Sequence, residues 1–183
     1  MKPLALFQAS SPSDRVSGAS ILAAIDTLGV WRARGIKILE EHGIVDPQPT
    51  EWYPWQAYLD ALRYIYEKVG PATVGEIGKK LVAGNTFPPT IDSIEAALSM
   101  LDHDYRLRHH GADIGFFRFE RTGARAGAMT IRNPYPCELD RGVVTALAQR
   151  FRPPASPLTR VEHVDAARCR KQGAACCELR VSW

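Results

Sequence analysis

The hydrophobic period of the chain changes after Gly111, and this change limits the folds that the chain can adopt. Before Gly111, apolar residues recur at steps of three and four, which is the spacing of one buried helix face. After it, apolar and polar residues alternate, as they do in a strand with one buried face. A helical part followed by strands predicts an α+β fold, in which helices pack on a small antiparallel sheet.

The helical part divides at glycines and prolines, which end or interrupt regular structure. Asp92 and Glu95 have the spacing of a capping box and predict the start of one helix. Three prolines within residues 47–54 predict an irregular loop. The predicted helices cover residues 13–29, 31–43, 55–70, 72–84 and 92–107.

The second part of the chain contains strands and one inserted helix. Residues 113–123 and 125–133 predict a β-hairpin around Gly123. The spacing of the apolar residues in 140–151 is that of a helix. Residues 160–165 and 177–183 are the last predicted strands, so the antiparallel sheet is built mainly from the second part of the chain.

Composition limits the classes of function. The 183 residues, 45% hydrophobic and 23% charged, fit one soluble globular domain over 1–183. A net charge of +3 is too balanced to indicate a nucleic-acid binder. The sequence contains no apolar run long enough for a membrane span and no signal peptide, so we expect a cytoplasmic protein whose thiols stay reduced.

Cysteines are concentrated at the end of the chain. Cys169, Cys176 and Cys177 lie within nine residues, and Cys137 is the fourth cysteine of the sequence. Thiolates are preferred ligands of zinc, but the chain has no CxxC motif of the zinc-ribbon or thioredoxin type. Two interpretations stay open: a metal site, or small buried side chains packed in the last strand.

The order of these elements resembles the superfamily of 4-vinyl-reductase-like domains and haem-nitric-oxide-binding-like domains, in particular its stand-alone bacterial members. The similarity runs from about Gly43 to Trp183 and depends on the combination of several stretches rather than on one motif. These stretches are residues 43–65, 87–105 and 133–151 and the cysteine-rich end, 169–183.

The resemblance implies an apolar pocket between helices and sheet that takes a small hydrophobic or aromatic molecule. Residues with the periodicity of inward-facing positions supply candidate walls, and Trp52 and Trp55 would belong to a lid on the proline-rich loop. The alternative for each of these residues is an ordinary place in the core. The predicted ligand-binding residues are Trp52, Trp55, Tyr105, Phe117, Phe119, Met129, Ile131 and Trp183.

The resemblance also implies a zinc ion held by cysteines near the C-terminus. Cys169 and Cys177 correspond to the closely spaced pair of the family, and Cys137 to its third cysteine. The family's fourth ligand is a glutamate three residues before the pair, where this chain has Ala166. The sequence leaves several replacements open: Cys176 turned inward, or Glu162, His163 or Asp165 after a rebuilt strand end.

Haem is the less favoured cofactor. The haem-binding relatives use a helical histidine and a Tyr-x-Ser-x-Arg element, and this chain lacks that element and any CxxCH motif. His103 and His109 lie near the end of a predicted helix, where a solvated basic end is the simpler interpretation. No acid–base pair for catalysis is evident, so the sequence does not define an enzyme.

The sequence therefore predicts a small-molecule sensor or carrier that signals through a partner or a second copy. Residues 1–50 would form a helical region, rich in small residues and suited to a homodimer, and residues 51–183 the ligand-binding core. The alternatives are a cysteine-ligated zinc or haem-iron metalloprotein, a protein-interaction module and an accessory factor of tetrapyrrole chemistry.

Overall fold

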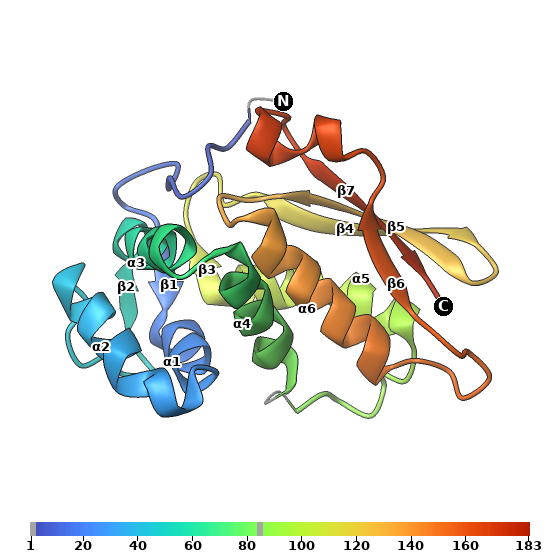
Figure 1. Cartoon of the computed structure of the whole chain (residues 1–183), viewed down its shortest axis with the longest axis horizontal. Coiled ribbons are helices and arrows are strands. Elements are labelled where there is room, and N and C mark those ends of the chain that lie inside the picture. Colours follow the sequence, from blue (N-terminus) through green and yellow to red (C-terminus); the bar gives the residue numbers. More distant parts are fainter. Residues whose placement is uncertain (1–2, 84–85) are drawn as a thin grey trace.

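The computed structural model describes residues 3–83 and 86–183 and confirms the α+β fold. A four-stranded sheet covers α5 and α6, and the other helices extend away from it (Figure 1). The helices are α1 (Gly18–Asp26), α2 (Arg32–Glu41), α3 (Trp55–Lys68), α4 (Pro71–Ala83), α5 (Ile94–Arg108) and α6 (Cys137–Arg150). The strands are β1 (Arg15–Ser17), β2 (Trp52–Pro54), β3 (His109–His110), β4 (Phe116–Gly123), β5 (Ala126–Arg132), β6 (Arg160–His163) and β7 (Cys177–Ser182).

A three-stranded sheet of order β2-β1-β3 joins parts of the chain that are far apart in sequence. Both pairings of β1 are antiparallel, and Val16 lies opposite Tyr53 and His109. Residues 52–54 therefore form a strand, and the prediction of an irregular loop there was wrong for these three residues. Strands this short carry no alternation that a sequence pattern could reveal.

Two helices of the first half, α2 and α3, end at their predicted glycines, whereas α1 and α5 begin later than predicted, and residues 15–17 of the first predicted helix form β1. The backbone at Gly43 and Gly70 has positive φ angles of 86° and 122°, which close α2 and α3. The N-cap of α5 is Ser93, whose hydroxyl accepts a hydrogen bond from Ala96 N at 3.2 Å, so the capping box at Asp92 was wrong. The predicted end of the fourth helix, Gly84, lies outside the described residues.

The larger sheet has the order β4-β5-β7-β6 and is antiparallel throughout. The β4–β5 hairpin sets Phe117 opposite Ile131 and Phe119 opposite Met129. In β7 the side chains of Cys177, Leu179 and Val181 are buried between exposed neighbours. The predicted hairpin and the predicted last strand are confirmed.

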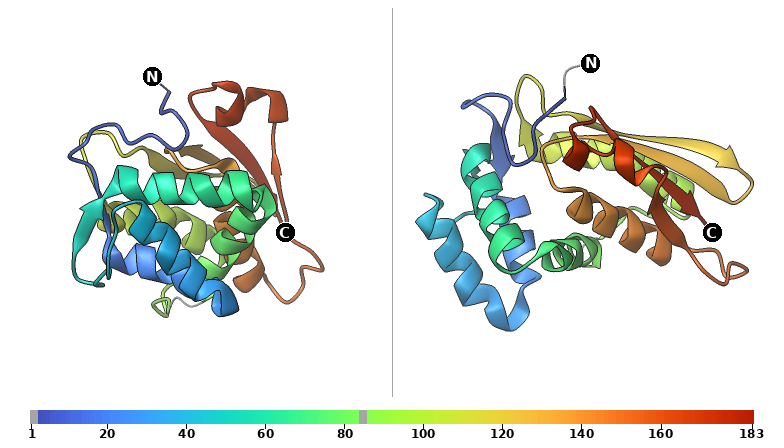
Figure 2. Two further views of the ribbon diagram at one scale, coloured as in Figure 1. Left: turned by 60° about the vertical axis from the view of Figure 1, so that its left-hand side comes forward. Right: turned by 45° about the horizontal axis from the view of Figure 1, so that its top comes forward.

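Helix α6 packs against α4 at backbone distance (Figures 1 and 2). A Cβ atom added at Gly78 would lie 2.2 Å from Leu139 O, and one at Gly142 would lie 2.2 Å from Gly75 O. Glycines on both helices are what permits this approach, and neither helix can shift without moving the other. The first residue of α6 is Cys137, three residues before the predicted start at Asp140.

One hydrophobic cluster runs through the molecule, from Phe7 and the helices to the inner face of the larger sheet. Trp55, Leu98 and Met129 are among its fully buried side chains. Within the two described ranges, no helix is both long enough and apolar enough to cross a membrane.

Candidate functional site

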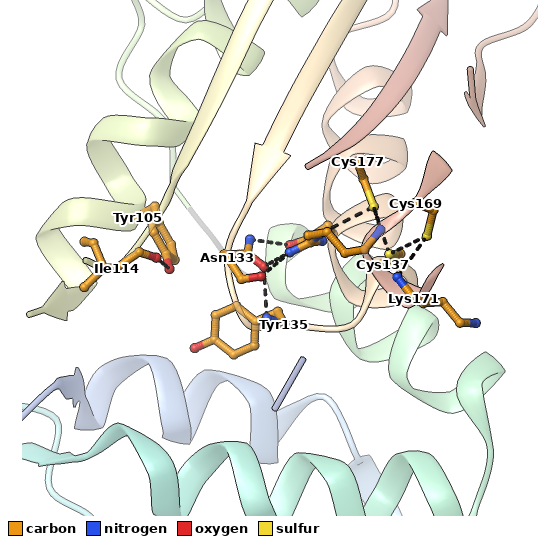
Figure 3. Close-up of polar contacts among 10 residues, drawn as sticks. Tyr105, Ile114, Asn133, Tyr135, Cys137, Cys169, Lys171 and Cys177 are labelled. Carbon is orange, nitrogen blue, oxygen red and sulfur yellow. Dashed lines mark hydrogen bonds and ion pairs between the residues drawn. The ribbon is translucent and has the colours of Figure 1, made fainter. Parts of the chain in front are cut away.

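Three cysteines and one histidine meet where α6, β6 and β7 begin or end. The Sγ atom of Cys137 lies 3.0 Å from that of Cys177 and 3.3 Å from that of Cys169 (Figure 3). One ring nitrogen of His163 joins them, and all four donor atoms lie within 4.8 Å of one another. We call these four residues the Cys–His cluster.

Each member of the Cys–His cluster is fixed by its place in the fold. Cys137 is the first residue of α6, His163 the last of β6 and Cys177 the first of β7. Cys169 lies between two short 3₁₀ turns, Ala166–Arg168 and Arg170–Gln172. Asp165 caps the first of these turns by accepting a hydrogen bond from Ala167 N at 2.8 Å. The connection between β6 and β7 thereby folds back over the start of α6.

Hydrogen-bond donors converge on the sulfur atoms. The backbone N–H and the Nε of Arg170 donate to Cys177 Sγ at 3.3 and 3.4 Å, and Lys171 N donates to Cys169 Sγ at 3.4 Å. Hydrogen bonding from Cys137, together with the positive charge of Arg170, lowers the pKa of the Cys177 thiol, whereas the same hydrogen bond and burial raise the pKa of the Cys137 thiol. The surroundings thus favour a thiolate at Cys177, and the thiolate is the form of cysteine that binds metals.

The donor set fits a zinc ion. Three thiols and one imidazole form a Cys₃His set, which is common in structural zinc sites. The Nε2 atom of His163 is buried and has no hydrogen-bond partner among the described residues. A buried polar atom of this kind costs free energy unless something binds it. A tetrahedral zinc–thiolate site has sulfur–sulfur edges of roughly 3.7 Å, so the sulfurs would separate by about half an ångström.

The structure selects among the replacements for the missing glutamate ligand. His163 lies in the cluster, six residues before Cys169, and Ala166 does not supply a donor. Cys176, one of the predicted ligands, is half-buried and lies outside the cluster. Burial raises the pKa of its thiol, in contrast to that of Cys177. Cys176 and Cys177 are successive residues at the start of a strand, so their side chains point to opposite faces.

An apolar cavity of about 200 Å³ lies between the helices and the larger sheet. Its walls come from α1, α3, α4, α5 and α6, with Phe117 of β4 and Tyr135 of the β5–α6 turn. Apolar side chains such as Leu101, Val143 and Leu147 form most of the surface, and Asp140 is one of its few charged members. The volume compares with the ~150 Å³ that encloses a single benzene ring.

The predicted ligand-binding residues are only partly brought together. Tyr105 and Phe117 line the cavity. Trp55 begins α3 and is fully buried in the core, and Trp52 stacks on His110 at 3.7 Å between ring centroids, so neither belongs to a lid. The remaining four pack in the sheet or at its end, outside the cavity lining: Phe119, Met129, Ile131 and Trp183.

A buried polar network at one wall of the cavity was not predicted. Trp55 Nε1 donates to the hydroxyl of Tyr135 at 3.0 Å, and that oxygen lies 2.7 Å from His109 Nε2. His109 Nδ1 lies 2.9 Å from Tyr105 O. Burial lowers the pKa of His109 to about 4, so the ring is neutral at physiological pH. Tyr135 was not singled out because nothing in the spacing of residues 133–136 indicates a place at the cavity.

The cavity and the histidines do not fit a haem. A porphyrin is several times larger than a benzene ring, whereas the cavity has about 200 Å³. Of the five histidines in the sequence only His109 lines the cavity, and both of its ring nitrogens are in contact with other groups. His103 is exposed on α5, and His163 lies in the Cys–His cluster.

The same fold is found among solved structures of H-NOX proteins. The chain is similar to an H-NOX protein from S. oneidensis in its Fe(II)NO state, with a TM-score of 0.68, 15% identity and coverage of 91% of this chain and 98% of that chain. It is also similar to an H-NOX mutant from T. tengcongensis (TM-score 0.67, 17% identity, coverage 91% and 96%). For an H-NOX mutant from K. algicida the TM-score is 0.64, the identity 10% and the coverage 91% and 95%.

No family model and no curated protein sequence matches the chain. At identities of 10–17% the likeness establishes the fold, that of the haem-nitric-oxide-binding domains. It does not transfer a cofactor to this chain.

Proposed function

We propose that this protein is a small-molecule sensor or carrier of the 4-vinyl-reductase-like type, which binds a hydrophobic or aromatic molecule in the cavity. The observation that carries the proposal is an apolar cavity of about 200 Å³ with a few polar groups at one wall. Pockets of this composition bind small molecules by burying their apolar surface, and the polar groups orient them. The H-NOX domains of similar fold are described in iron-ligated, gas-bound states, which is consistent with a sensor fold.

The size of the cavity restricts the ligand to about one aromatic ring. Tyr58 reaches the cavity from α3, and no hydrogen bond joins its hydroxyl to another described residue. Burial raises the pKa of that hydroxyl, so it is a neutral donor in the bound state. An aromatic ligand that carries one polar substituent would accept a hydrogen bond from the Tyr58 hydroxyl.

The second part of the proposal is a structural zinc ion held by Cys137, His163, Cys169 and Cys177. A metal bound there would link the start of α6 to β6, β7 and the loop between them. The chemistry it supplies is a cross-link between segments that the sequence separates by up to 40 residues. Thiolate ligands require a reducing compartment, which supports a cytoplasmic location.

The third part concerns partners. A signal from the bound ligand would pass to another protein or to a second copy of the chain. Val30 and Trp31 in the turn between α1 and α2 are 93% and 70% exposed, which supports a contact there rather than along α1, whose small residues pack inward. Trp31→Ser should leave folding intact and shift any dimer to monomer in size-exclusion chromatography with light scattering.

The experiment for the ligand is calorimetric titration of the purified protein with p-cresol and, as a size control, with a two-ring compound such as 2-naphthol. The proposal predicts saturable binding of p-cresol, weakened by Phe117→Ala, and much weaker binding of 2-naphthol. Mass spectrometry of small molecules extracted from the native protein would identify the natural ligand. Equal binding of both compounds, or of neither, would contradict a single-ring cavity.

A further inference from the structure

The Cys–His cluster and the cavity share a buried arginine. The side chain of Arg170 is 0% exposed, and its Nε donates to Cys177 Sγ at 3.4 Å. The terminal nitrogens of the same guanidinium donate to Asp140 Oδ2 and to Asn133, through both its backbone and its side-chain oxygen. One rigid, planar group therefore contacts a member of the cluster and a residue of the cavity wall, Asp140, at the same time.

The contacts of Arg170 connect to α6 in two ways, through the Cys–His cluster and through Asp140. Cys137 is the first residue of α6, and Asp140 lies one turn further along. Val143 and Leu147 continue the cavity wall on the same helix. The position of the first turn of α6 is thus set by the cluster on one side and by Arg170 on the other.

A second branch of the network leads to the polar wall of the cavity. Asn133 Nδ2 donates to Asp140 Oδ1 at 3.1 Å, and Asn133 Oδ1 accepts from Tyr135 N at 2.9 Å. In Figure 3, Asn133 and Tyr135 lie between the cysteines on one side and Tyr105 on the other. Because the Tyr135 hydroxyl contacts His109, the network is continuous from Cys177 to the cavity.

Tight packing would carry a displacement further. The backbones of α4 and α6 meet at glycines, so a shift of α6 must move α4 with it. Leu81 and Val82 of α4 also line the cavity. Packed interfaces of this kind move between discrete arrangements rather than yielding gradually.

We infer that metal binding at the Cys–His cluster and ligand binding in the cavity are coupled through Arg170, so that the metal-bound cluster holds the cavity in its binding form. The inference rests on the proposed function, because it needs both a metal and a cavity ligand. The affinities are linked, and each ligand therefore tightens the binding of the other by the same factor. Arg170 is a positioning residue in this scheme and touches neither ligand.

The test measures p-cresol affinity with zinc bound and after zinc removal by a chelator, in the full chain. Coupling predicts an affinity about tenfold higher in the zinc-bound protein, and the same factor in zinc affinity measured with a competing chromogenic chelator. Equal p-cresol affinity in the two forms would overturn the coupling while leaving the cavity and the metal site standing. Absence of zinc binding would overturn both the coupling and the metal part of the proposed function.

A second readout does not depend on the choice of ligand. Hydrogen exchange of the α6 amides 141–147 should accelerate when zinc is removed from the wild-type protein. In the double variant Arg170→Met with Asp140→Asn, which removes both buried charges together, exchange should be fast and zinc-independent although zinc still binds. If p-cresol does not bind, the ligand part of the proposal fails, and amide exchange alone tests the coupling. Exchange of the α6 amides that does not change on zinc removal would contradict the coupling.

The matched control is Arg168→Met, which removes an exposed arginine from the same loop. We expect it to preserve the zinc dependence of both p-cresol affinity and amide exchange. Loss of the zinc dependence in Arg168→Met as well would show that the loop acts as a whole and would contradict a specific role for Arg170.

Discussion

The Cys–His cluster and the cavity lie along the same helix, α6, but they are built in different ways. The cluster is made of chemically distinctive residues, three of them within the last 21 positions of the chain, at the ends of strands and helices. The cavity is made of ordinary apolar residues from five helices that are spread over most of the sequence. Residue type can therefore indicate a candidate metal site from the sequence, whereas a cavity depends on packing that residue type does not encode.

The largest effect is expected at the cluster. Cys137→Ser removes a buried ligand of the proposed zinc ion and should lower the free energy of unfolding by about 4 kcal/mol at a free zinc concentration about a thousandfold above the dissociation constant. Cys176→Ser, which changes a residue outside the cluster, should cost less than about 0.5 kcal/mol. Thermal and denaturant unfolding in the presence of zinc would measure both. Equal losses would show that Cys176 belongs to the site.

Met129 and Phe117 were both predicted to line the pocket, but the structure predicts different effects when each is replaced by alanine. Met129 is fully buried in the sheet and outside the cavity, so Met129→Ala should cost about 3 kcal/mol of stability and leave p-cresol affinity unchanged. Phe117 lines the cavity, and Phe117→Ala should change both stability and affinity. Denaturant unfolding and calorimetric titration of each variant would check this. Loss of affinity in Met129→Ala alone would place the binding site elsewhere.

The polar wall of the cavity predicts a pH dependence. His109 is held neutral by burial, with a pKa of about 4, whereas an unfolded chain binds a proton near pH 6.5. The unfolded state therefore binds more protons between these values, and stability falls as the pH falls below 6.5, by about 2 kcal/mol at pH 5.

The matched comparison for the pH effect is His109→Phe, which removes the titrating group and keeps an aromatic ring. From pH 6.5 to pH 5 the unfolding free energy of the wild type should fall by about 1.6 kcal/mol more than that of the variant. A constant difference over this range would mean that the pKa of His109 is the same in the folded and the unfolded protein. Zinc content must be checked at each pH, because acid also releases metal from thiolates.

The smallest effects are expected at the contact between α4 and α6, through which a displacement would pass from one region to the other. Gly78→Ala would place a Cβ 2.2 Å from Leu139 O, a backbone atom, and should cost about 1–2 kcal/mol by forcing α4 from α6. Gly75→Ala, one turn earlier on α4, meets Glu138 O at an ordinary 3.5 Å and should gain about 0.5 kcal/mol from reduced chain entropy. Thermal unfolding of the pair would measure the contrast. Equal responses would mean that the two helices are not in tight contact.

Much of the fold follows from the sequence. The change of period at Gly111 predicts the α+β class, and alternation in β4, β5 and β7 predicts the hairpin and the last strand. The strands β1, β2 and β3 have two or three residues each, too few for any periodicity. The choice of Ser93 over Asp92 as N-cap depends on backbone angles that capping spacing does not determine.

The candidate site could be predicted from the sequence only in part. Cys137, Cys169 and Cys177 are distinctive residues, and their grouping could be predicted from the resemblance. His163 joins them only because the loop after β6 folds back over α6, a geometry that spacing does not give. Tyr58 and Tyr135 were missed because a helix or turn position does not reveal which core residues leave a gap between them.

The central claim is that Cys137, His163, Cys169 and Cys177 hold one metal ion. Elemental analysis and an absorption spectrum, on protein purified without an affinity metal or a chelator, test it most directly. The account predicts one zinc per chain, no Soret band, loss of the zinc in His163→Ala and its retention in Cys176→Ser. A metal-free protein, a Soret band, or zinc that survives His163→Ala and is lost in Cys176→Ser would contradict it.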